Sequence, residues 1–491
     1  MRRGFVLAVA AVWIALVRFA GAAAVDGGAL LSGAGVRGGL VVHPGCTDGA
    51  FLASLCPRAG FAVHGLVADS GRLNDVRASV RERGAYGAVS VHRYRGHLPY
   101  AKNLLNALVV PAGIPLPAAE AVRVLAPGGV VLQEGAGFRA SGLTAPAPVR
   151  GIEGWYASRR IWPAELDQWG HFLHDSGNNA VARDRAIGPP ERVQWAAAPL
   201  WSKEHDVTPS IFAPVTAGGR LFAIQEEGPV CIIDERIPDR FFLVARDAFN
   251  GTVLWKRPLE DWYSMRVIWG HIPAHTQRRL VASSDRVYAT LGLQQPVTCL
   301  DAGTGKTVRV FEGTERASEL VLDDGILAVV IRSEKSAVGT LAGRERTRFR
   351  PGYHGPQTPS EAIVAVDVST GERLWRREYN CMPSTLAVQN GRALFAETDH
   401  VVGVDLRTGR ELWRVPLEVR TLVAQEDTVV VAGARAWADY KSNEKTIRVT
   451  ALSAEDGRSL WSAEGDCLPN FHFFYVPADV YIARGQVWAL A

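Results

Sequence analysis

The sequence predicts a multidomain protein, in which a Rossmann-like α/β domain is followed by an all-β propeller. Two observations predict this architecture. The phrase Asp-x-x-x-Gly-x-x-x-Trp recurs through the second half of the 491 residues, with strand-like sequence between its copies. In the first part, strand-like and helix-like segments alternate from about residue 40 to residue 134. Repeats of this size indicate a propeller, whereas alternating strands and helices indicate a parallel sheet.

The repeated phrase has the chemistry of a tight turn between two strands. Residues 247–255, 367–375 and 405–413 are full copies; in two degenerate copies Arg309 replaces Trp and Ser453 replaces Asp. Asp and Thr side chains can bond the turn backbone, and Gly accepts a positive φ. Runs of β-forming residues lie between the copies, at 219–224, 285–290, 324–330, 391–396, 427–431 and 485–490.

The repeats predict about five complete blades and a partial sixth. Five units close at Trp255, Arg309, Trp375, Trp413 and Trp461, and the sixth reaches only the strand at 485–491. An open ring leaves a strand edge unpaired. We therefore expect a propeller that is truncated at the C-terminus and completed by further sequence or by another chain.

The first domain carries a candidate nucleotide-binding corner. A buried strand at 40–43 runs through a glycine-containing turn into a helix at 50–56, an arrangement that binds anions and nucleotides. Candidate cofactor-binding residues are Gly45, Asp48 and Gly49 in this turn, with Asp69 after the next strand. Later elements are expected at 104–110 (strand), 118–125 (helix) and 126–132 (strand).

The N-terminus has the form of a secretory signal. A basic start, an apolar run over residues 4–17 and small residues at 20–24 predict a signal peptide over 1–24, with a retained membrane anchor as the alternative. We expect a periplasmic or cell-envelope protein with no stable transmembrane segment after cleavage. The predicted division is 31–139 for the α/β domain, 140–168 for a linker and 169–491 for the propeller.

Charge and cysteine content exclude several classes of function. A net charge of +4 is too small to indicate binding of nucleic acid. The six cysteines form no Cys-x-x-Cys motif, so neither a zinc site nor a c-type haem is predicted, and their spacing identifies no disulfide pairs. His171, His174 and Asp175 could form part of a metal site, because His-x-x-His can place two imidazoles on one side of a helix turn, but no further ligand with suitable spacing is visible. We favour a structural role for them; the polar residues 203–206 remain unassigned.

The repeat resembles that of quinoprotein (PQQ-type) propellers, since residues 365–375 match Ala-x-Asp-x-x-Thr-Gly-x-x-x-Trp at every fixed position. The resemblance implies that the repeat tryptophans pack between neighbouring blades. It also raises pyrroloquinoline quinone (PQQ) with calcium as a cofactor, although spacing assigns no residue to either. Residues 162–179 and 187–195 resemble the segment that opens such propellers, and the chain as a whole resembles exported bacterial fusions of a methyltransferase-like domain with a propeller.

The first domain resembles class I S-adenosylmethionine (SAM)-dependent methyltransferases, including the turn Leu125-Ala-Pro-Gly-Gly129. It departs from them where their chemistry lies. His43 stands where an acidic residue is expected, Asp69 is distant from its strand, and Lys102-Asn103 stands in place of a catalytic motif.

We therefore expect a binding or scaffolding propeller with a degenerate methyltransferase-like domain, acting on a protein or cell-envelope partner. A PQQ-dependent dehydrogenase of an alcohol or sugar, and an active SAM-dependent methyltransferase, are the alternatives. Catalytic residues are not identified, and no metal is assigned.

Overall fold

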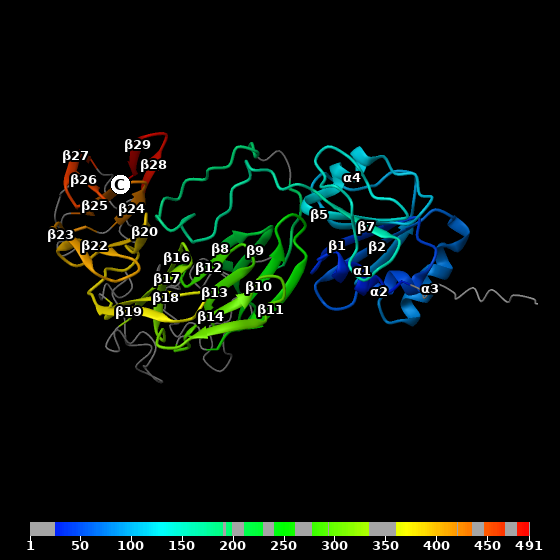
Figure 1. Ribbon diagram of the computed structural model, residues 1–491, viewed down its shortest axis with the longest axis horizontal. Coiled ribbons are helices and arrows are strands. Elements are labelled where there is room, and N and C mark those ends of the chain that lie inside the picture. The colour runs from blue at the N-terminus through cyan, green and yellow to red at the C-terminus, as the bar shows by residue number, and fades with distance from the viewer. Residues whose placement is uncertain are drawn as a thin grey trace, which may run out of the picture.

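The computed structural model describes residues 25–189, 193–198, 211–228, 240–260, 277–292, 294–332, 360–419, 421–434, 446–466 and 479–490. The expected signal peptide and the polar residues 203–206 lie outside these ranges. Figure 1 shows an α/β domain at one end and a series of small antiparallel sheets at the other. Among the described residues, no helix has the length and apolar character needed to cross a membrane.

The first domain is built on a seven-stranded sheet of order β3-β2-β1-β4-β5-β7-β6. Strands β1 to β5 are parallel, and β7 runs antiparallel to β5 and β6. The strand order reverses between β1 and β4, which is the switch point of a doubly wound sheet. This confirms the Rossmann-like prediction. The strands are β1 (Gly39–Pro44), β2 (Phe61–Val67), β3 (Val89–Arg93), β4 (Leu105–Val110), β5 (Leu125–Glu134), β6 (Ala147–Pro148) and β7 (Trp155–Arg159).

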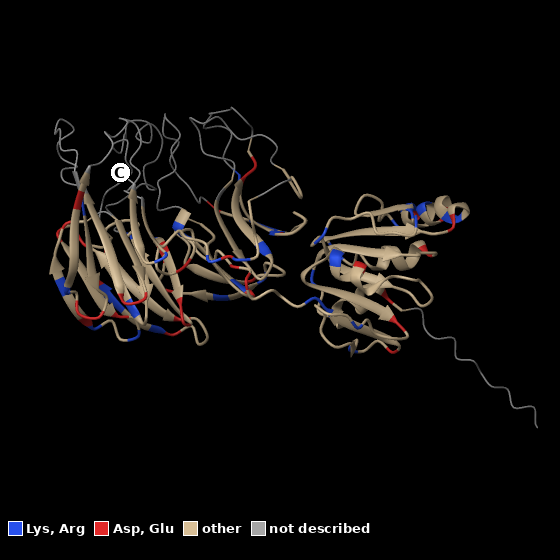
Figure 2. Ribbon diagram, turned by 90° about the horizontal axis from the view of Figure 1, so that it is seen from above, with Lys and Arg blue, Asp and Glu red and all other residues tan. Residues whose placement is uncertain are grey.

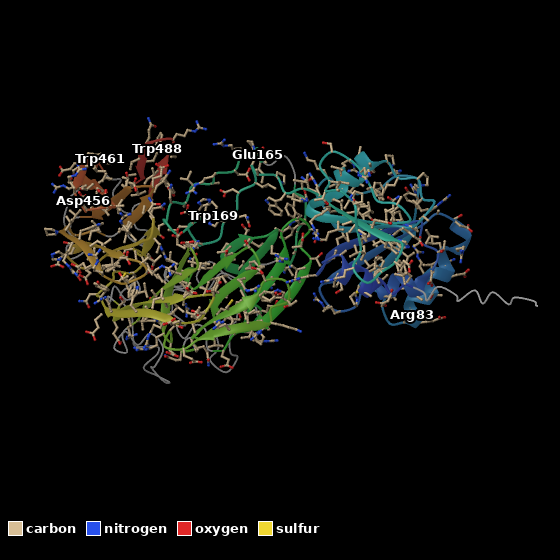
Figure 3. All side chains as sticks on the ribbon, viewed as in Figure 1. Arg83, Glu165, Trp169, Asp456, Trp461 and Trp488 are labelled. Carbon is tan, nitrogen blue, oxygen red and sulfur yellow. The ribbon has the colours of Figure 1, made fainter. Side chains whose placement is uncertain are left out.

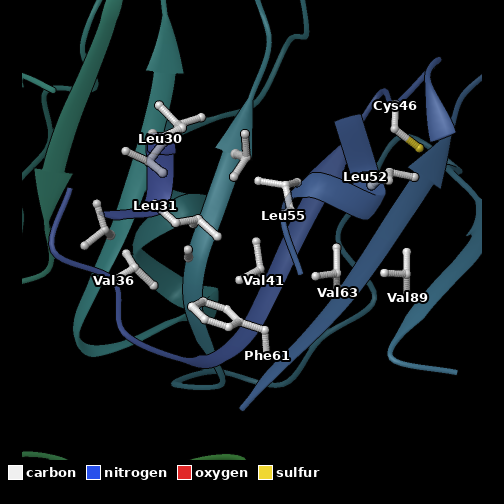
Figure 4. Packing of buried hydrophobic residues seen from close by; sticks show 14 of the residues in the cluster. Leu30, Leu31, Val36, Val41, Cys46, Leu52, Leu55, Phe61, Val63 and Val89 are labelled. Atoms are coloured by element: carbon white, nitrogen blue, oxygen red, sulfur yellow. The ribbon is translucent and has the colours of Figure 1, made fainter. Parts of the chain in front are cut away.

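Helices cover both faces of this sheet because its strands are apolar on both sides. Alternate residues of a strand point to opposite faces, so Val41 packs in the core with Leu30 and Leu52 (Figure 4), whereas Val42 packs with Val124. The first face carries α1 (Gly27–Gly33), α2 (Gly49–Ser54) and α3 (Leu73–Glu82), and the second carries α4 (Ala118–Val124).

The first domain extends further in both directions than its predicted range. Helix α1 begins before residue 31, and β6 and β7 lie inside the segment predicted to be a linker. Strand β7 pairs with β5 along five residues, so this part of the segment belongs to the sheet. Strand β3 was not singled out in the sequence. The described cysteines, Cys46, Cys56, Cys299 and Cys381, are free thiols.

The described residues of the second part form five four-stranded antiparallel sheets and a two-stranded sixth, as the repeats predict. Blade 1 is β8 (Ile211–Ala217), β9 (Arg220–Glu226), β10 (Phe241–Asp247) and β11 (Val253–Pro258); blade 2 is β12 (Leu280–Ser283), β13 (Arg286–Thr290), β14 (Val297–Asp301) and β15 (Thr307–Phe311); blade 3 is β16 (Ala317–Asp323), β17 (Ile326–Ile331), β18 (Ala362–Asp367) and β19 (Arg373–Glu378). Blade 4 is β20 (Ala387–Gln389), β21 (Arg392–Ala396), β22 (His400–Asp405) and β23 (Glu411–Pro416); blade 5 is β24 (Thr421–Gln425), β25 (Thr428–Ala434), β26 (Thr446–Ser453) and β27 (Ser459–Asp466); the sixth sheet is β28 (Asp479–Ala483) and β29 (Gln486–Leu490). The first strands of successive blades contact one another and form the hub.

The glycine turn of the repeated phrase receives a side chain from the preceding unit in each four-stranded blade. Trp375 of blade 3 lies against Gly409 of blade 4, and its Nε1 donates to the carbonyl oxygen of Leu406 at 2.8 Å. A β-carbon on Gly409, which has a φ of +66°, would lie 2.6 Å from the indole ring. The glycine therefore serves both the turn and the contact between blades. The same contact joins Trp195 to Gly251, Trp255 to Gly305 and Trp413 to Gly457, and Arg309 takes the place of Trp against Gly371.

Trp461 is the repeat tryptophan that lacks this contact among the described residues. It is 41% exposed, whereas Trp255, Trp375 and Trp413 are 9%, 8% and 7% exposed. Figure 3 shows Trp461 and Trp488 at the end of the propeller away from the first domain. The inter-blade role implied by the resemblance therefore holds for the other three tryptophans and leaves Trp461 as an apolar edge.

Candidate functional site

The predicted cofactor corner lies at the carboxyl edge of the parallel sheet. Asp48 caps helix α2, because its Oδ1 accepts from the N–H of Ala50 at 2.8 Å and its Oδ2 from the N–H of Phe51 at 3.2 Å. Aspartate is favoured at this position since it satisfies amides that the helix leaves unpaired. Both carboxylate oxygens of Asp48 are therefore committed to the turn itself.

The two glycines of the corner are closely packed by side chains of the protein. Gly45 has a φ of +72°, and Ile114, in the loop after β4, lies where its β-carbon would be. A β-carbon on Gly49 would lie 2.6 Å from the β-carbon of Ser79 on α3. Glycine at these two positions thus allows side chains of the domain to pack against the turn. These side chains occupy the space beside the glycines that a cofactor would otherwise approach.

His43 closes the switch point between β1 and β4. Its Nδ1 lies 2.8 Å from the carbonyl oxygen of Val109 on β4, and its ring meets the edge of Phe51 at 5.2 Å between centroids. Burial lowers the pKa of His43, so the side chain is neutral at pH 7. A neutral imidazole bonded to a neighbouring strand does not supply the carboxylate that the methyltransferase resemblance requires here.

Asp69 lies at the same edge, and the expectation that it is distant from its strand is wrong, because β2 continues to Val67. The side chain has a local role. Its Oδ1 accepts from the N–H of Gly71 at 2.9 Å and caps the short 3₁₀ helix Ser70–Arg72. The structure therefore brings Gly45, Asp48, Gly49 and Asp69 to one edge of the sheet. Each has a partner or a packing role within the domain.

The prediction that Lys102 and Asn103 replace a catalytic motif placed them at the wrong edge. They precede β4, on the amino side of the sheet, where Asn103 donates its N–H to the carbonyl oxygen of Arg123 at 2.9 Å. Pro111 follows β4 at the carboxyl edge instead. A motif at the carboxyl end of this strand would follow Val110, whereas Lys102 and Asn103 lie before the strand begins.

The hub of the propeller holds a segment that sequence reasoning did not place there. This segment, the hub strap (residues 169–179), runs after the first domain and reaches across the inner strands (Figure 1). It accepts a hydrogen bond from the inner strand of each blade in chain order. The pairs are Thr216 N–H to Trp169 O (2.7 Å), Ala282 N–H to Gly170 O (2.9 Å), Leu322 N–H to His171 Nε2 (3.0 Å), Val388 N–H to Ser176 O (2.7 Å), Ala424 N–H to Gly177 O (2.7 Å) and Ile482 N–H to Asn179 Oδ1 (3.0 Å).

A buried polar cluster lies beneath the strap. Arg278 and Glu319 form an ion pair with Nε and Oε2 3.2 Å apart, and their side chains are 6% and 1% exposed. Asn178 of the strap accepts from Arg278 and donates to the carbonyl oxygen of Leu386 at 2.9 Å. Burial raises the pKa of Glu319, and the neighbouring Arg278 opposes that shift. The cavity beside this cluster measures about 10 Å³, which is no larger than one water molecule.

The two histidines of the strap have separate partners. His171 accepts from Leu322, as described, and burial lowers its pKa to about 4. His174 lies between two carboxylates, with its Nε2 2.7 Å from Asp167 and its Nδ1 3.3 Å from Asp175. The carboxylate of Asp175 is the main cause that raises the pKa of His174. Within the described ranges, no group of three His, Cys, Asp or Glu side chains is arranged to hold a metal.

Comparison with known proteins relates both parts of the chain to other folds. Residues 359–488 match the family model described as outer membrane protein assembly factor BamB, over well under half of the chain. No curated protein matches the chain. The sheet order and the repeats make the chain a Rossmann-like α/β domain followed by a β-propeller, and the family match shows that residues 359–488 carry PQQ-like repeats.

Several solved structures are similar to parts of the chain. BamB from Moraxella catarrhalis is 14% identical, with 59% of this chain and 80% of that chain covered and a TM-score of 0.32. A putative SAM-dependent methyltransferase from Methanococcus maripaludis is 14% identical, with 28% and 85% covered and a TM-score of 0.24. Geranyl diphosphate methyltransferase is 22% identical, with 21% of this chain and 42% of that chain covered and a TM-score of 0.20. This chain thus spans less than half of that last enzyme, and no activity is carried over from these likenesses.

Proposed function

We propose that this protein is an exported propeller that binds or scaffolds a protein or cell-envelope partner, and that its methyltransferase-like domain transfers no methyl group. The observation that carries the proposal is the hub strap. It accepts a hydrogen bond from the inner strand of every described blade, so the chain itself occupies the inner edges of these strands. The surface of the propeller is then the part left for recognition.

The residues of the hub do not fit PQQ with calcium. The carboxylate, amide and guanidinium groups that could serve such a cofactor, on Glu319, Asn178 and Arg278, bond one another and the inner strands. The cavity beside them holds no more than about one water. A tricyclic quinone would have to displace the strap and break a buried ion pair, which leaves uncompensated charge.

A titration with PQQ and calcium tests this part of the proposal. The full chain is mixed with both, and binding is measured by calorimetry beside dye-linked oxidation of alcohols and sugars. We expect no binding heat and no turnover above a control without quinone. Calcium-dependent turnover would establish the dehydrogenase alternative.

The same reasoning supports a first domain that does not use SAM. Ile114 packs against the glycine corner. Asp48 and Asp69 each cap a helix, and His43 forms a hydrogen bond with β4. We expect calorimetric titration of the full chain with SAM to give no binding in the micromolar range. A low-micromolar dissociation constant would contradict the proposed loss of cofactor binding.

Partner binding is tested by site-specific photo-crosslinking in living cells. A photoreactive residue replaces Val308, which is 51% exposed on blade 2, and in a matched control replaces Tyr86, which is 55% exposed on the first domain. We expect a defined crosslinked species from position 308, found in the envelope fraction. Crosslinks from position 86 alone, or cytoplasmic recovery of the full chain, would contradict a propeller-mediated role in the envelope.

A further inference from the structure

A pocket of about 200 Å³ lies between the amino edge of the first sheet and the turns of blades 1 and 2. The first domain contributes the segment before β1 and the start of β5, and the propeller contributes the β8–β9 and β10–β11 turns. Hydrogen bonds across the junction hold its walls, since Asn250 donates to the carbonyl oxygen of Leu104 at 2.9 Å and to Asn106 at 2.8 Å. The pocket is at the opposite edge from the glycine corner.

The charged lining of this pocket is mainly cationic. Arg37, Arg159 and Arg220 reach it from three separate elements, and Figure 2 shows basic positions on both sides of the junction. Asp247 is the acidic residue that lines it, and its oxygens are already bonded. Asn106 donates to its Oδ2 at 2.6 Å, and the N–H of Phe249 donates to its Oδ1 at 2.9 Å.

Among the three arginines of the pocket, Arg220 is the one whose charge and hydrogen-bond donors are least committed to the protein. Its described hydrogen bonds both leave from Nη1 and are long, at 3.3 Å to the carbonyl oxygen of Gly218 and 3.5 Å to that of Ser284. In the described part of the chain it makes no ion pair, whereas Arg37 pairs with Asp301 at 2.9 Å. A guanidinium presents a planar fork of donors that fits an oxyanion in two-point contact.

An aromatic wall stands beside these cations. Trp162 and Phe249 meet edge to face with ring centroids 6.1 Å apart. β-Carbons built on Gly128 and Gly219 would lie 3.7 Å and 3.4 Å from the ring of Trp162, so glycine backbone from both domains flanks the indole. Aromatic rings pack well against flat apolar groups.

We propose that this interdomain pocket binds a small organic oxyanion, a carboxylate or phosphate ester with a flat apolar part. The arginines hold the oxyanion, Trp162 and Phe249 contact the apolar part, and the bound ligand bridges the two domains. Benzoate and phenyl phosphate represent the two sources of this chemistry, and inorganic phosphate tests whether the apolar part is needed.

The test is calorimetric and thermal titration of the full chain with these three probes. We expect benzoate or phenyl phosphate to bind and to raise the melting temperature, and inorganic phosphate to bind at least about tenfold more weakly. Arg220→Gln should weaken binding about tenfold or more, as expected when a charged hydrogen bond is lost. Arg448→Gln is the matched control, because Arg448 pairs with Glu464 on blade 5 and neither residue lines the pocket.

Two further variants keep the proposal open to refutation. Trp162→Leu should weaken phenyl phosphate and leave inorganic phosphate unchanged. If Arg220→Gln fails to fold, Arg37→Gln replaces it, because the side chain of Arg37 is 53% exposed. Absence of binding by all three probes at millimolar concentration, or equal affinity in a folded Arg220→Gln or Arg37→Gln variant, would overturn the proposal.

Discussion

The first domain contains one glycine corner that is packed by its own chain, whereas the propeller contains five glycine turns packed in the same manner. Ile114 fills the space beside Gly45, as Trp375 fills the space beside Gly409. A glycine in a turn shows that something approaches the backbone closely, without showing whether it is a ligand or a side chain. In the propeller the repetition resolves this, because each turn is matched to a Trp or its substitute. In the first domain the sequence of the single corner is compatible with a cofactor and with a packed side chain alike, and only the position of Ile114 in the structure distinguishes them.

The largest expected effect comes from the tryptophan side of the propeller contact. Trp375→Ala should lower the free energy of unfolding by about 3–5 kcal/mol, the range for deletion of a large buried aromatic side chain. Trp461→Ala, at the exposed edge, should lower it by about 1 kcal/mol or less. Urea denaturation of both variants measures the difference. Equal losses would mean that contact with a glycine turn is not what distinguishes the two positions.

The glycine side of the same contact gives the next effect. Gly409→Ala should cost about 2–3 kcal/mol, because alanine is strained at positive φ and its methyl group would meet Trp375. Gly391→Ala is the matched control, with a φ of +71° and nothing within 4 Å of a built β-carbon. It should cost about 1 kcal/mol, from the backbone alone. The interpretation fails if the two variants unfold at the same urea concentration.

The corresponding change in the first domain sharpens the comparison. Ile114→Ala should cost about 1–2 kcal/mol, less than for a fully buried isoleucine, because Ile114 is only partly buried. Calorimetry should still detect no SAM binding, since Asp48, Asp69 and His43 keep their partners within the domain. Micromolar SAM binding by this variant would show that the corner is intact and that Ile114 alone blocks it.

The smallest expected effect is an opposite pH response of two histidines. His43 in the first domain has a lowered pKa, so its contribution to stability is present above the ordinary histidine pKa of about 6.5 and is lost as the pH falls. His174 in the hub strap has a raised pKa, so its contribution is present below about 6.5 and is lost as the pH rises through the folded value.

Stability curves from pH 5 to 9 for His43→Asn and His174→Gln, each subtracted from wild type, separate the two contributions. We expect differences that decline toward acid for His43 and toward alkali for His174. Parallel slopes would contradict the assigned environments.

The sequence was sufficient for the parts of the fold that have a side-chain signature. The Asp-x-x-x-Gly-x-x-x-Trp phrase predicted the five complete blades and the partial sixth, because the turns and the packing between blades both depend on those residues. Apolar periodicity predicted β1, β2, β4 and β5 with helices α2 and α4 of the first domain, whereas α1, α3, β3, β6 and β7 were not identified. The hub strap could not be predicted in this way, because most of its contacts use carbonyl oxygens of Trp169, Gly170, Ser176 and Gly177, which any residue supplies.

The candidate sites were predicted less well, for a related reason. The sequence predicted Gly45, Asp48, Gly49 and Asp69 together at one edge of the first sheet. It could not assign their role, because helix capping and cofactor binding require the same residue types. Lys102 and Asn103 were assigned to the wrong end of β4. The interdomain pocket combines Arg37, Arg159 and Arg220, which no spacing rule connects.

The hub strap precedes every blade in the sequence, and this order matters when the chain is synthesised. Domains fold as units during synthesis, from the N-terminus onward, so residues 169–179 leave the ribosome before any blade exists. Blades of a repeat array ordinarily contact only their neighbours and can form in many orders. Here each new inner strand meets an acceptor already waiting for it, in the same order in which the blades emerge. The strap thus provides each blade with its own hydrogen-bond acceptor, and the order of these acceptors along residues 169–179 defines the position of each blade around the axis.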